Sequence, residues 1–154
     1  MKSTLYYIHD PMCSWCWAFR PVWQTVQQQL PQHIEVNYLL GGLAADTNQP
    51  MPETLQNTIR QTWQHIQTAV PGTEFNHEFW TTCQPRRSTY PACRAVIAAR
   101  TQGNQYEQAM INAIQHAYYL DAKNPSDDEV LIELAAKLKL DLKQFQTDLN
   151  SQQT

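Results

Sequence analysis

The sequence predicts an α/β fold in which a short strand–helix–strand unit is followed by a long helical region. Two runs rich in β-branched and aromatic residues, 4–9 and 34–40, flank a segment in which apolar residues recur at helical spacing. Beyond Gly41-Gly42 the apolar pattern stays helical to the end of the chain. We therefore expect residues 1–42 to form the strand–helix–strand half, and residues 43–154 the helical half, of a single structural domain.

The first strand and the first helix meet at a turn that contains two cysteines. The strand TLYYIH ends at Asp10-Pro11, a pair that breaks regular structure. The helix that follows has one apolar face, formed by Phe19, Val22, Trp23, Val26 and Leu30. Pro21 falls inside this helix and should kink it near residue 17, and Pro31 ends it.

The second strand, IEVNYLL, should pair in parallel with the first, because a helix connects them. Further helices are expected over residues 52–68, 90–103, 104–120, 126–138 and from 141 onward, with a short amphipathic turn at 74–80. Thr89 and Asp141 are candidate N-caps, and Ser126 to Glu129 match a capping box.

Composition narrows the class of protein. Of the 154 residues, 42% are hydrophobic and only 16% are charged, and the net charge is −3. This balance predicts a packed globule and argues against nucleic acid or an anionic membrane as the main partner. The N-terminal stretch MKSTLYYIHDP has too short an apolar segment for a signal peptide, and no run of about 18 apolar residues occurs. We therefore expect a cytoplasmic protein without a membrane span.

Cys13 and Cys16 have the spacing and the position of a redox dithiol. In a reducing compartment a close cysteine pair is more often catalytic or metal-binding than structural. Cys13 comes at the start of the helix, where the free backbone N–H groups of Trp15 and Cys16 and the helix dipole favour a thiolate. Cys16, one turn later, can attack a mixed disulfide formed on Cys13.

Two other readings of the cysteines remain open. A zinc site would need two more ligands at suitable spacing, and Cys83 and Cys93, nine residues apart, do not match a zinc-knuckle pattern. The pair could also be reduced core cysteines, although a strand-to-helix turn is a poor place to bury Cys13. Dithiol chemistry is the reading we favour, with no metal.

The stretch D-P-M-C-S-W-C-W, with a proline five residues after the second cysteine, resembles the DsbA family of the thioredoxin superfamily. Within it, the chain is most similar to the FrnE-like and 2-hydroxychromene-2-carboxylate isomerase-like branch, and R-S-T-Y-P-A-C-R-A at 87–95 resembles the helix start beside that branch's active site. The resemblance implies a thioredoxin-like βαβ unit with a large helical insertion. It extends through essentially the whole chain.

The resemblance also implies roles for individual residues. Cys13 matches the nucleophile and Cys16 the resolving cysteine. Ser14 and Trp15 match the dipeptide that tunes the redox potential, and Pro21 matches the helix-kinking proline. Cys93 falls where relatives commonly carry histidine. Because its segment resembles one beside the family's site, we expect Cys93 to lie in the helical layer and face the CxxC turn, without a bond to Cys83.

The C-terminal antiparallel strands of the fold, with their cis-proline, have no counterpart in this sequence. The last proline, Pro125, precedes a helix start rather than a strand. A two-stranded sheet leaves unpaired edges. We therefore expect either a shortened version of a longer protein, with a half-built site and weak turnover, or a partner chain, such as the second subunit of a homodimer, that supplies the edge cover.

Two other features near the motif bear on the site. His9, four residues before Cys13, could favour the thiolate if protonated. Trp15 and Trp17 could form an apolar contact surface for polypeptide, and we expect Trp15 to be exposed and Trp17 half-buried.

The combined prediction is a cytoplasmic thiol–disulfide oxidoreductase acting as a reductase or isomerase on protein or small-molecule thiols and disulfides. Its only cofactor-like group is the Cys13–Cys16 pair, with glutathione as a candidate co-substrate. One alternative is a glutathione-dependent isomerase or transferase of the 2-hydroxychromene type, whose relatives use serine rather than a cysteine pair. A second is a non-enzymatic, chaperone-like polypeptide-binding module.

Overall fold

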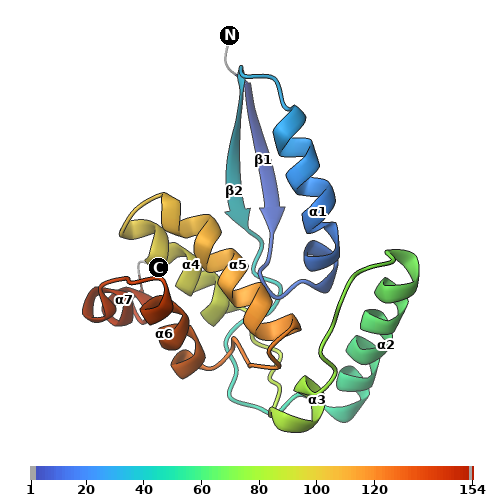
Figure 1. Ribbon diagram of the computed structural model, residues 1–154. Helices are drawn as coiled ribbons and strands as arrows, with labels where there is room; N and C mark the ends of the chain where they lie inside the picture. The colour runs from blue at the N-terminus through green and yellow to red at the C-terminus, as the bar shows by residue number, and fades with distance from the viewer. Residues whose placement is uncertain (1–2, 153) are drawn as a thin grey trace.

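The computed structural model describes residues 3–152 and 154, and the chain alternates strand and helix only at its start (Figure 1). The strands are β1 (Ser3–His9) and β2 (Ile34–Leu40). The helices are α1 (Ser14–Gln29), α2 (Glu53–Ala69), α3 (Phe79–Thr82), α4 (Tyr90–Thr101), α5 (Gln105–Tyr119), α6 (Asp128–Lys137) and α7 (Leu142–Leu149). The predicted α/β fold is confirmed.

The two strands pair in parallel, from Ser3 opposite Ile34 to His9 opposite Leu40. Both run toward the helical half, so the turn after β1 lies between the sheet and the helices (Figure 1). Helix α1 is held to one face of the sheet by aromatic contacts, because Tyr7 stacks on Trp23 at 4.2 Å and Trp23 Nε1 donates to the Tyr38 hydroxyl at 2.9 Å. The β1–α1 turn is therefore held in place by the pairing of β1 with β2 and by the contacts of α1 with the sheet.

The other face of the sheet is uncovered. Tyr6, Ile8 and Leu39 point away from α1, and Ile8 is 67% exposed. Within residues 3–152 and 154 the sheet consists of β1 and β2 alone, so each strand has one unpaired edge. Figure 1 shows α1 beside the upper parts of the strands and no other helix there.

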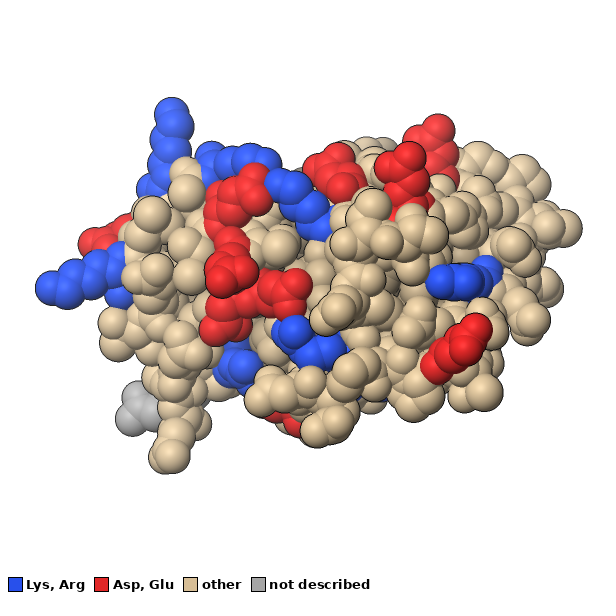
Figure 2. Space-filling view, turned by 90° about the horizontal axis from the view of Figure 1, so that it is seen from below, with Lys and Arg blue, Asp and Glu red and all other residues tan. Residues whose placement is uncertain are grey.

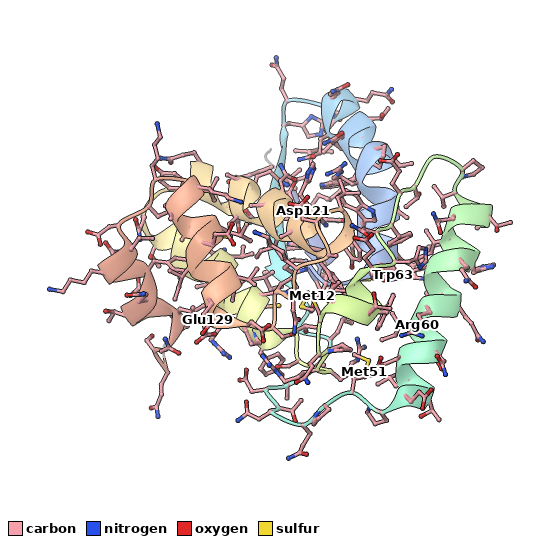
Figure 3. The ribbon with its side chains drawn as sticks, turned by 60° about the horizontal axis from the view of Figure 1, so that its bottom comes forward. Met12, Met51, Arg60, Trp63, Asp121 and Glu129 are labelled. Atoms are coloured by element: carbon pink, nitrogen blue, oxygen red, sulfur yellow. The ribbon has the colours of Figure 1, made fainter. Side chains whose placement is uncertain are left out.

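The helical half has the main hydrophobic core. Its largest fully buried side chains are Trp63, Tyr119, Phe79, Phe145, Ile66, Met110, Ile114, Leu131, Leu149 and Val96. Met12, directly before Cys13, belongs to the same core and lies between the helices in Figure 3. The cysteine turn is thus anchored in the helical half by its own neighbour. Among the described residues, no helix combines the length and apolarity that a bilayer crossing requires.

One expectation about α1 is wrong. Its predicted apolar face included Phe19 and Val22, yet these two side chains are 40% and 52% exposed. The helix uses two other contact surfaces instead: Trp23 faces the sheet, and Trp17 with Ala18 faces the helical core. Because these surfaces lie on different sides of α1, a single apolar face does not describe its packing.

Two predicted N-caps are also absent. Thr89 precedes α4 but makes no side-chain cap, because its hydroxyl donates to Asp10 Oδ2 at 2.8 Å. The capping box at α6 does not form, since the Ser126 hydroxyl donates to the Ser88 carbonyl and Asp127 pairs with Arg86 at 2.8 Å. In both cases the side chain is held by tertiary partners instead of facing the first amides of the helix; the Thr89 oxygen, for example, accepts from the Ala44 amide at 3.1 Å. The predicted cap at Asp141 is confirmed, because its carboxylate accepts from the Gln144 amide at 3.0 Å.

Candidate active site

Cys13 and Cys16 lie where β1 gives way to α1. Cys13 is the N-cap residue, with extended backbone angles of φ −81° and ψ 115°, and α1 begins at Ser14. The Cys13 amide donates to the Asp10 carbonyl at 3.0 Å, which closes a tight turn through Pro11. This turn directs the first amides of the helix toward the Cys13 sulfur.

The surroundings of Cys13 favour its thiolate. The Cys16 thiol donates to the Cys13 sulfur, and the backbone N–H groups of Cys16 and Trp15 also point at it; together they lower the Cys13 pKa to about 6. Partial burial and the negative charge of Asp10 act in the opposite direction. Hydrogen bonds to the charged form therefore outweigh desolvation at this sulfur.

Cys16 has the opposite character. Its pKa is raised, first because its proton is held by the Cys13 sulfur and second because the group is partly buried. The Tyr7 hydroxyl also faces Cys16, and burial together with this neighbour raises the Tyr7 pKa to about 12. The pair thus consists of one acidic sulfur and one that keeps its proton at neutral pH.

Asp10 is a buried carboxylate beside the pair, and it has partners from three separate parts of the chain. It accepts from the Met12 amide at 2.8 Å, from the Leu43 amide at 2.9 Å and from the Thr89 hydroxyl at 2.8 Å. The carboxylate therefore ties the cysteine turn to the segment after β2 and to the start of α4. The sequence marked Asp10-Pro11 as a strand breaker and as part of the family-like motif, but it did not identify these partners, which lie up to 79 residues away.

The comparisons with known proteins agree with this geometry. The sequence profile of the thioredoxin family matches residues 6–154. The chain belongs to the thioredoxin family. Its structure resembles that of a candidate protein disulfide isomerase from Nitrosomonas europaea, with a TM-score of 0.84 and 29% identity over 99% of this chain and 72% of that one. It also resembles the cytosolic disulfide reductase DsbM from Pseudomonas aeruginosa, with a TM-score of 0.76 and 24% identity over 96% and 71% of the two chains.

The curated relatives are named as adapter proteins rather than as disulfide oxidoreductases. The chain is 26% identical over 151 residues to the ClpXP adapter protein SpxH of Halalkalibacterium halodurans, covering 96% of this chain and 49% of the relative. The chain thus spans about half the length of the curated relatives it matches. The predicted membership of the thioredoxin superfamily is confirmed, and a DsbA-type oxidoreductase from Streptomyces coelicolor shares the fold, with a TM-score of 0.67 at 20% identity.

The dipeptide between the cysteines of this thioredoxin-family chain is attached to helix α2. The Ser14 hydroxyl accepts from Trp63 Nε1 at 2.8 Å, and Trp15 packs edge-on against His65 at 5.9 Å. Trp63 is fully buried and appears at the inner side of α2 in Figure 3. The helical region therefore contacts the motif directly, through a partner that the sequence pattern did not identify.

The two tryptophans beside the cysteines have different environments. Trp15 is 45% exposed, as predicted. Trp17 is only 5% exposed, so the prediction of a half-buried side chain is wrong. Its ring stacks on Tyr119 at 5.3 Å and its Nε1 donates to the Glu74 carbonyl at 2.9 Å, which makes it part of the core. Of these two tryptophans, Trp15 is the one that presents an apolar surface next to the sulfurs.

His9 is not a cation in this fold. It is 4% exposed, and burial lowers its pKa below the ordinary value. The idea that a protonated His9 favours the thiolate is therefore wrong, because a buried imidazole without a strong anionic partner stays neutral at pH 7. Its ring lies between Tyr7 and Tyr38 instead, at centroid distances of 5.4 and 5.6 Å.

The remaining cysteines are close to the site but unbonded. All four cysteines of the chain are free thiols. Cys93 lies in α4 and directs its sulfur at Asp10 Oδ2 at 3.6 Å, so the predicted placement toward the cysteine turn is confirmed. Burial and Asp10 raise the Cys93 pKa to about 12. Cys83 donates to the Ala122 carbonyl at 3.1 Å. Pro21 is exposed inside α1, more than one turn beyond Cys16.

Proposed function

We propose that this chain is a thiol–disulfide oxidoreductase in which Cys13 attacks a substrate disulfide and Cys16 resolves the mixed disulfide. The Cys13 thiolate forms a bond to one substrate sulfur, and the other substrate sulfur leaves with the electron pair. Cys16 then attacks Cys13, which forms the Cys13–Cys16 disulfide and releases the reduced substrate. Ser14 and Trp15 set the potential of the pair through their contacts with α2.

The observation that carries this proposal is the difference in acidity between the two sulfurs. Cys13 has a pKa of about 6, so most of it is thiolate at neutral pH, whereas Cys16 keeps its proton. A nucleophile must be ionised to attack, and a resolving thiol must wait until a mixed disulfide has formed. The likeness to a candidate disulfide isomerase supports the same chemistry.

The direction of the reaction follows from the compartment. In the cytoplasm, which we propose as the location, the glutathione pool keeps dithiols reduced, so reduction or isomerisation of substrates is favoured over net oxidation. Glutathione is the candidate thiol that returns the pair to its reduced state. Substrates are protein or small-molecule disulfides.

The surface charge fits such partners. Figure 2 shows charged side chains of both signs interspersed on the side of α6 and α7, and more scattered charged groups on the side of α2. On the charged side Arg94 pairs with Asp46 at 2.7 Å and Arg86 with Asp127 at 2.8 Å. Paired charges of this kind create no broad positive field for nucleic acid.

The test is a titration of the Cys13 thiolate in the Cys16→Ala variant, followed by disulfide turnover with glutathione. In that variant Cys13 loses the hydrogen bond from Cys16 but keeps the amides, so we expect a pKa above 6 and still below the free value of about 8.5. Wild-type protein should reduce a model protein disulfide, and Cys13→Ala should not. A Cys13 pKa at or above the free value, or turnover that survives Cys13→Ala, contradicts the proposal.

A second function is favoured by the names of the curated relatives. Proteins called ClpXP adapter SpxH match this chain over 96% of its length, which supports a role in binding another polypeptide. The exposed Trp15 beside the sulfurs would contribute to such a surface. Replacing both Cys13 and Cys16 by alanine separates the functions: binding that persists without turnover favours the adapter role, and loss of both favours the oxidoreductase.

A further inference from the structure

A groove with apolar walls lies between helix α1 and the turn that follows α2. In Figure 1 the segment after α2 passes between α2 and α1. The groove has a volume of about 280 Å³, and its apolar walls include Val22 of α1, Val70 at the end of α2 and Leu120 at the end of α5. Val22 is 52% exposed, so this apolar surface is open to solvent. Pockets for drug-sized ligands measure about 300–1,000 Å³, and this groove is of a size for one large apolar side chain.

Arg20 brings an uncompensated positive charge to this groove. The guanidinium is partly buried, and it forms no ion pair with a carboxylate in the part of the chain that the structure describes. Burial lowers the pKa of Arg20 from its ordinary value, yet an arginine stays charged at neutral pH. Because charges that are withdrawn from water are normally paired, Arg20 is a candidate binding group for an anion.

The position of this guanidinium is fixed before any partner arrives. It lies over the Trp17 ring, 4.1 Å from the centroid, and its Nη1 donates to His116 Nε2 at 3.2 Å. These contacts restrain a long side chain that would otherwise lose rotamer freedom on binding. A guanidinium has five N–H donors, and one of them serves His116. Donors therefore remain for a contact with a carboxylate, which an arginine can bind through two parallel hydrogen bonds.

The other wall of the groove carries a negative charge. Glu74 lies in the turn after α2, and its carbonyl accepts from Trp17 Nε1 at 2.9 Å, which ties this wall to α1. Glu74 is exposed, and its carboxylate forms no ion pair with a residue in 3–152 or 154. A purely anionic ligand would be repelled by this carboxylate. A ligand with one charge of each sign, on either side of an apolar group, is complementary to both walls.

We propose that the groove binds an extended segment of a partner polypeptide, in which an acidic and a basic residue lie two positions on either side of a large apolar residue. Side chains of an extended chain alternate between its two faces, so residues at this spacing point the same way. The apolar side chain packs against Val22, the acidic one binds Arg20, and the basic one pairs with Glu74. The groove lining contains neither cysteine of the redox pair, so this inference is independent of the dithiol chemistry.

The probe is the capped peptide acetyl-Glu-Ser-Leu-Ser-Lys-amide, which has no thiol and no terminal charge, and titration calorimetry measures its affinity. Arg20→Met keeps an apolar stem over Trp17 but removes the charge. We expect the affinity to fall by at least about tenfold, as for the loss of charge-assisted hydrogen bonds. Replacing the peptide's Glu by Gln should cost a similar factor with the wild-type chain. The same peptide change should cost nothing further with Arg20→Met, because the two groups act on each other.

The matched control is Arg87→Met, the same change at an exposed arginine outside the groove, which should bind the peptide like the wild type. Should Arg20→Met fail to fold, the Glu-to-Gln peptide tests the same contact on the wild-type chain. Three results overturn the proposal: no binding to the wild type at millimolar peptide, an affinity that ignores the peptide's Glu, or binding that is lost in Trp15→Ala, which would place the peptide beside the sulfurs. Tighter binding of acetyl-Ser-Leu with a free carboxylate would assign the groove to a chain terminus and also overturn it.

Discussion

Cys13 and Cys16 are the same chemical group in one helical turn, yet the structure gives them opposite acidities. The main cause is the hydrogen bond between the two sulfurs, which stabilises the Cys13 thiolate and holds the proton on Cys16. The amides of Trp15 and Cys16 add to this effect at Cys13, and partial burial adds to it at Cys16. The C-x-x-C spacing at a helix start predicted that Cys13 would be the more acidic of the two. It did not predict the negative charge of Asp10, which opposes the thiolate and is held in place by partners remote in sequence. Residue-scale tuning of the site therefore depends on the tertiary fold.

Replacing Asp10 by asparagine should lower the Cys13 pKa below 6, because the carboxylate disfavours the neighbouring thiolate. It should also cost about 2 kcal/mol or more in the free energy of unfolding, since charge-assisted hydrogen bonds to Met12, Leu43 and Thr89 are lost or weakened. Ultraviolet thiolate absorbance and urea denaturation measure the two effects.

The matched control is Asp46→Asn, which makes the same charge change at a carboxylate paired with Arg94 on the surface. It should alter neither the Cys13 pKa nor the stability by a comparable amount, because exposed ion pairs contribute little. A Cys13 pKa that rises in Asp10→Asn would show that Asp10 acts by holding the turn rather than by its charge.

At the scale of elements, local patterns predicted most of the helices and both strands but not their contacts. The bounds of α2, α4 and α5 follow apolar periodicity and Gly or Pro breaks. The caps at Thr89 and Ser126 failed because each hydroxyl found a partner from another element. The sequence pattern could not predict the hydrogen bond that attaches α2 to the motif, because Trp63 and Ser14 lie 49 positions apart in the chain.

This attachment makes a specific prediction for α2. Trp63→Phe keeps an aromatic ring in the core but removes the N–H that Ser14 accepts. If that bond holds the turn, the amides should point less well at Cys13, and its pKa should rise. A hydrogen bond contributes about 0.5–1.5 kcal/mol, which corresponds to a rise of up to about one pKa unit. The redox potential of the pair should shift with it, measured against glutathione.

Trp80→Phe is the control for this variant. Trp80 is also buried in the aromatic cluster, and its indole nitrogen has no hydrogen-bond partner within the described part of the chain. Both variants should lose a similar amount of packing, but only Trp63→Phe should change the Cys13 pKa. Equal pKa shifts in the two would mean that packing, rather than the bond to Ser14, sets the acidity.

At the scale of the whole molecule, the two halves differ in how completely their apolar surfaces are covered. The helical half has a continuous core. The β1–β2 sheet, in contrast, is covered by α1 on one face only. The sequence predicted two strands and unpaired edges, and it could do so because strand patterns are local. It could not predict which face would be open, since that depends on the side on which α1 packs.

The open face predicts that the 154-residue chain associates with a second copy in solution. Tyr6, Ile8 and Leu39 form an exposed apolar surface next to an unpaired strand edge, a combination that favours pairing with another chain. Ile8→Lys places a charge in the middle of this surface and should shift sedimentation toward the monomer. Leu142→Lys, the same type of change at an exposed apolar residue of α7, should leave association unaltered. A wild-type chain that stays monomeric as its concentration rises, or equal effects of the two lysines, would rule out this face as the contact.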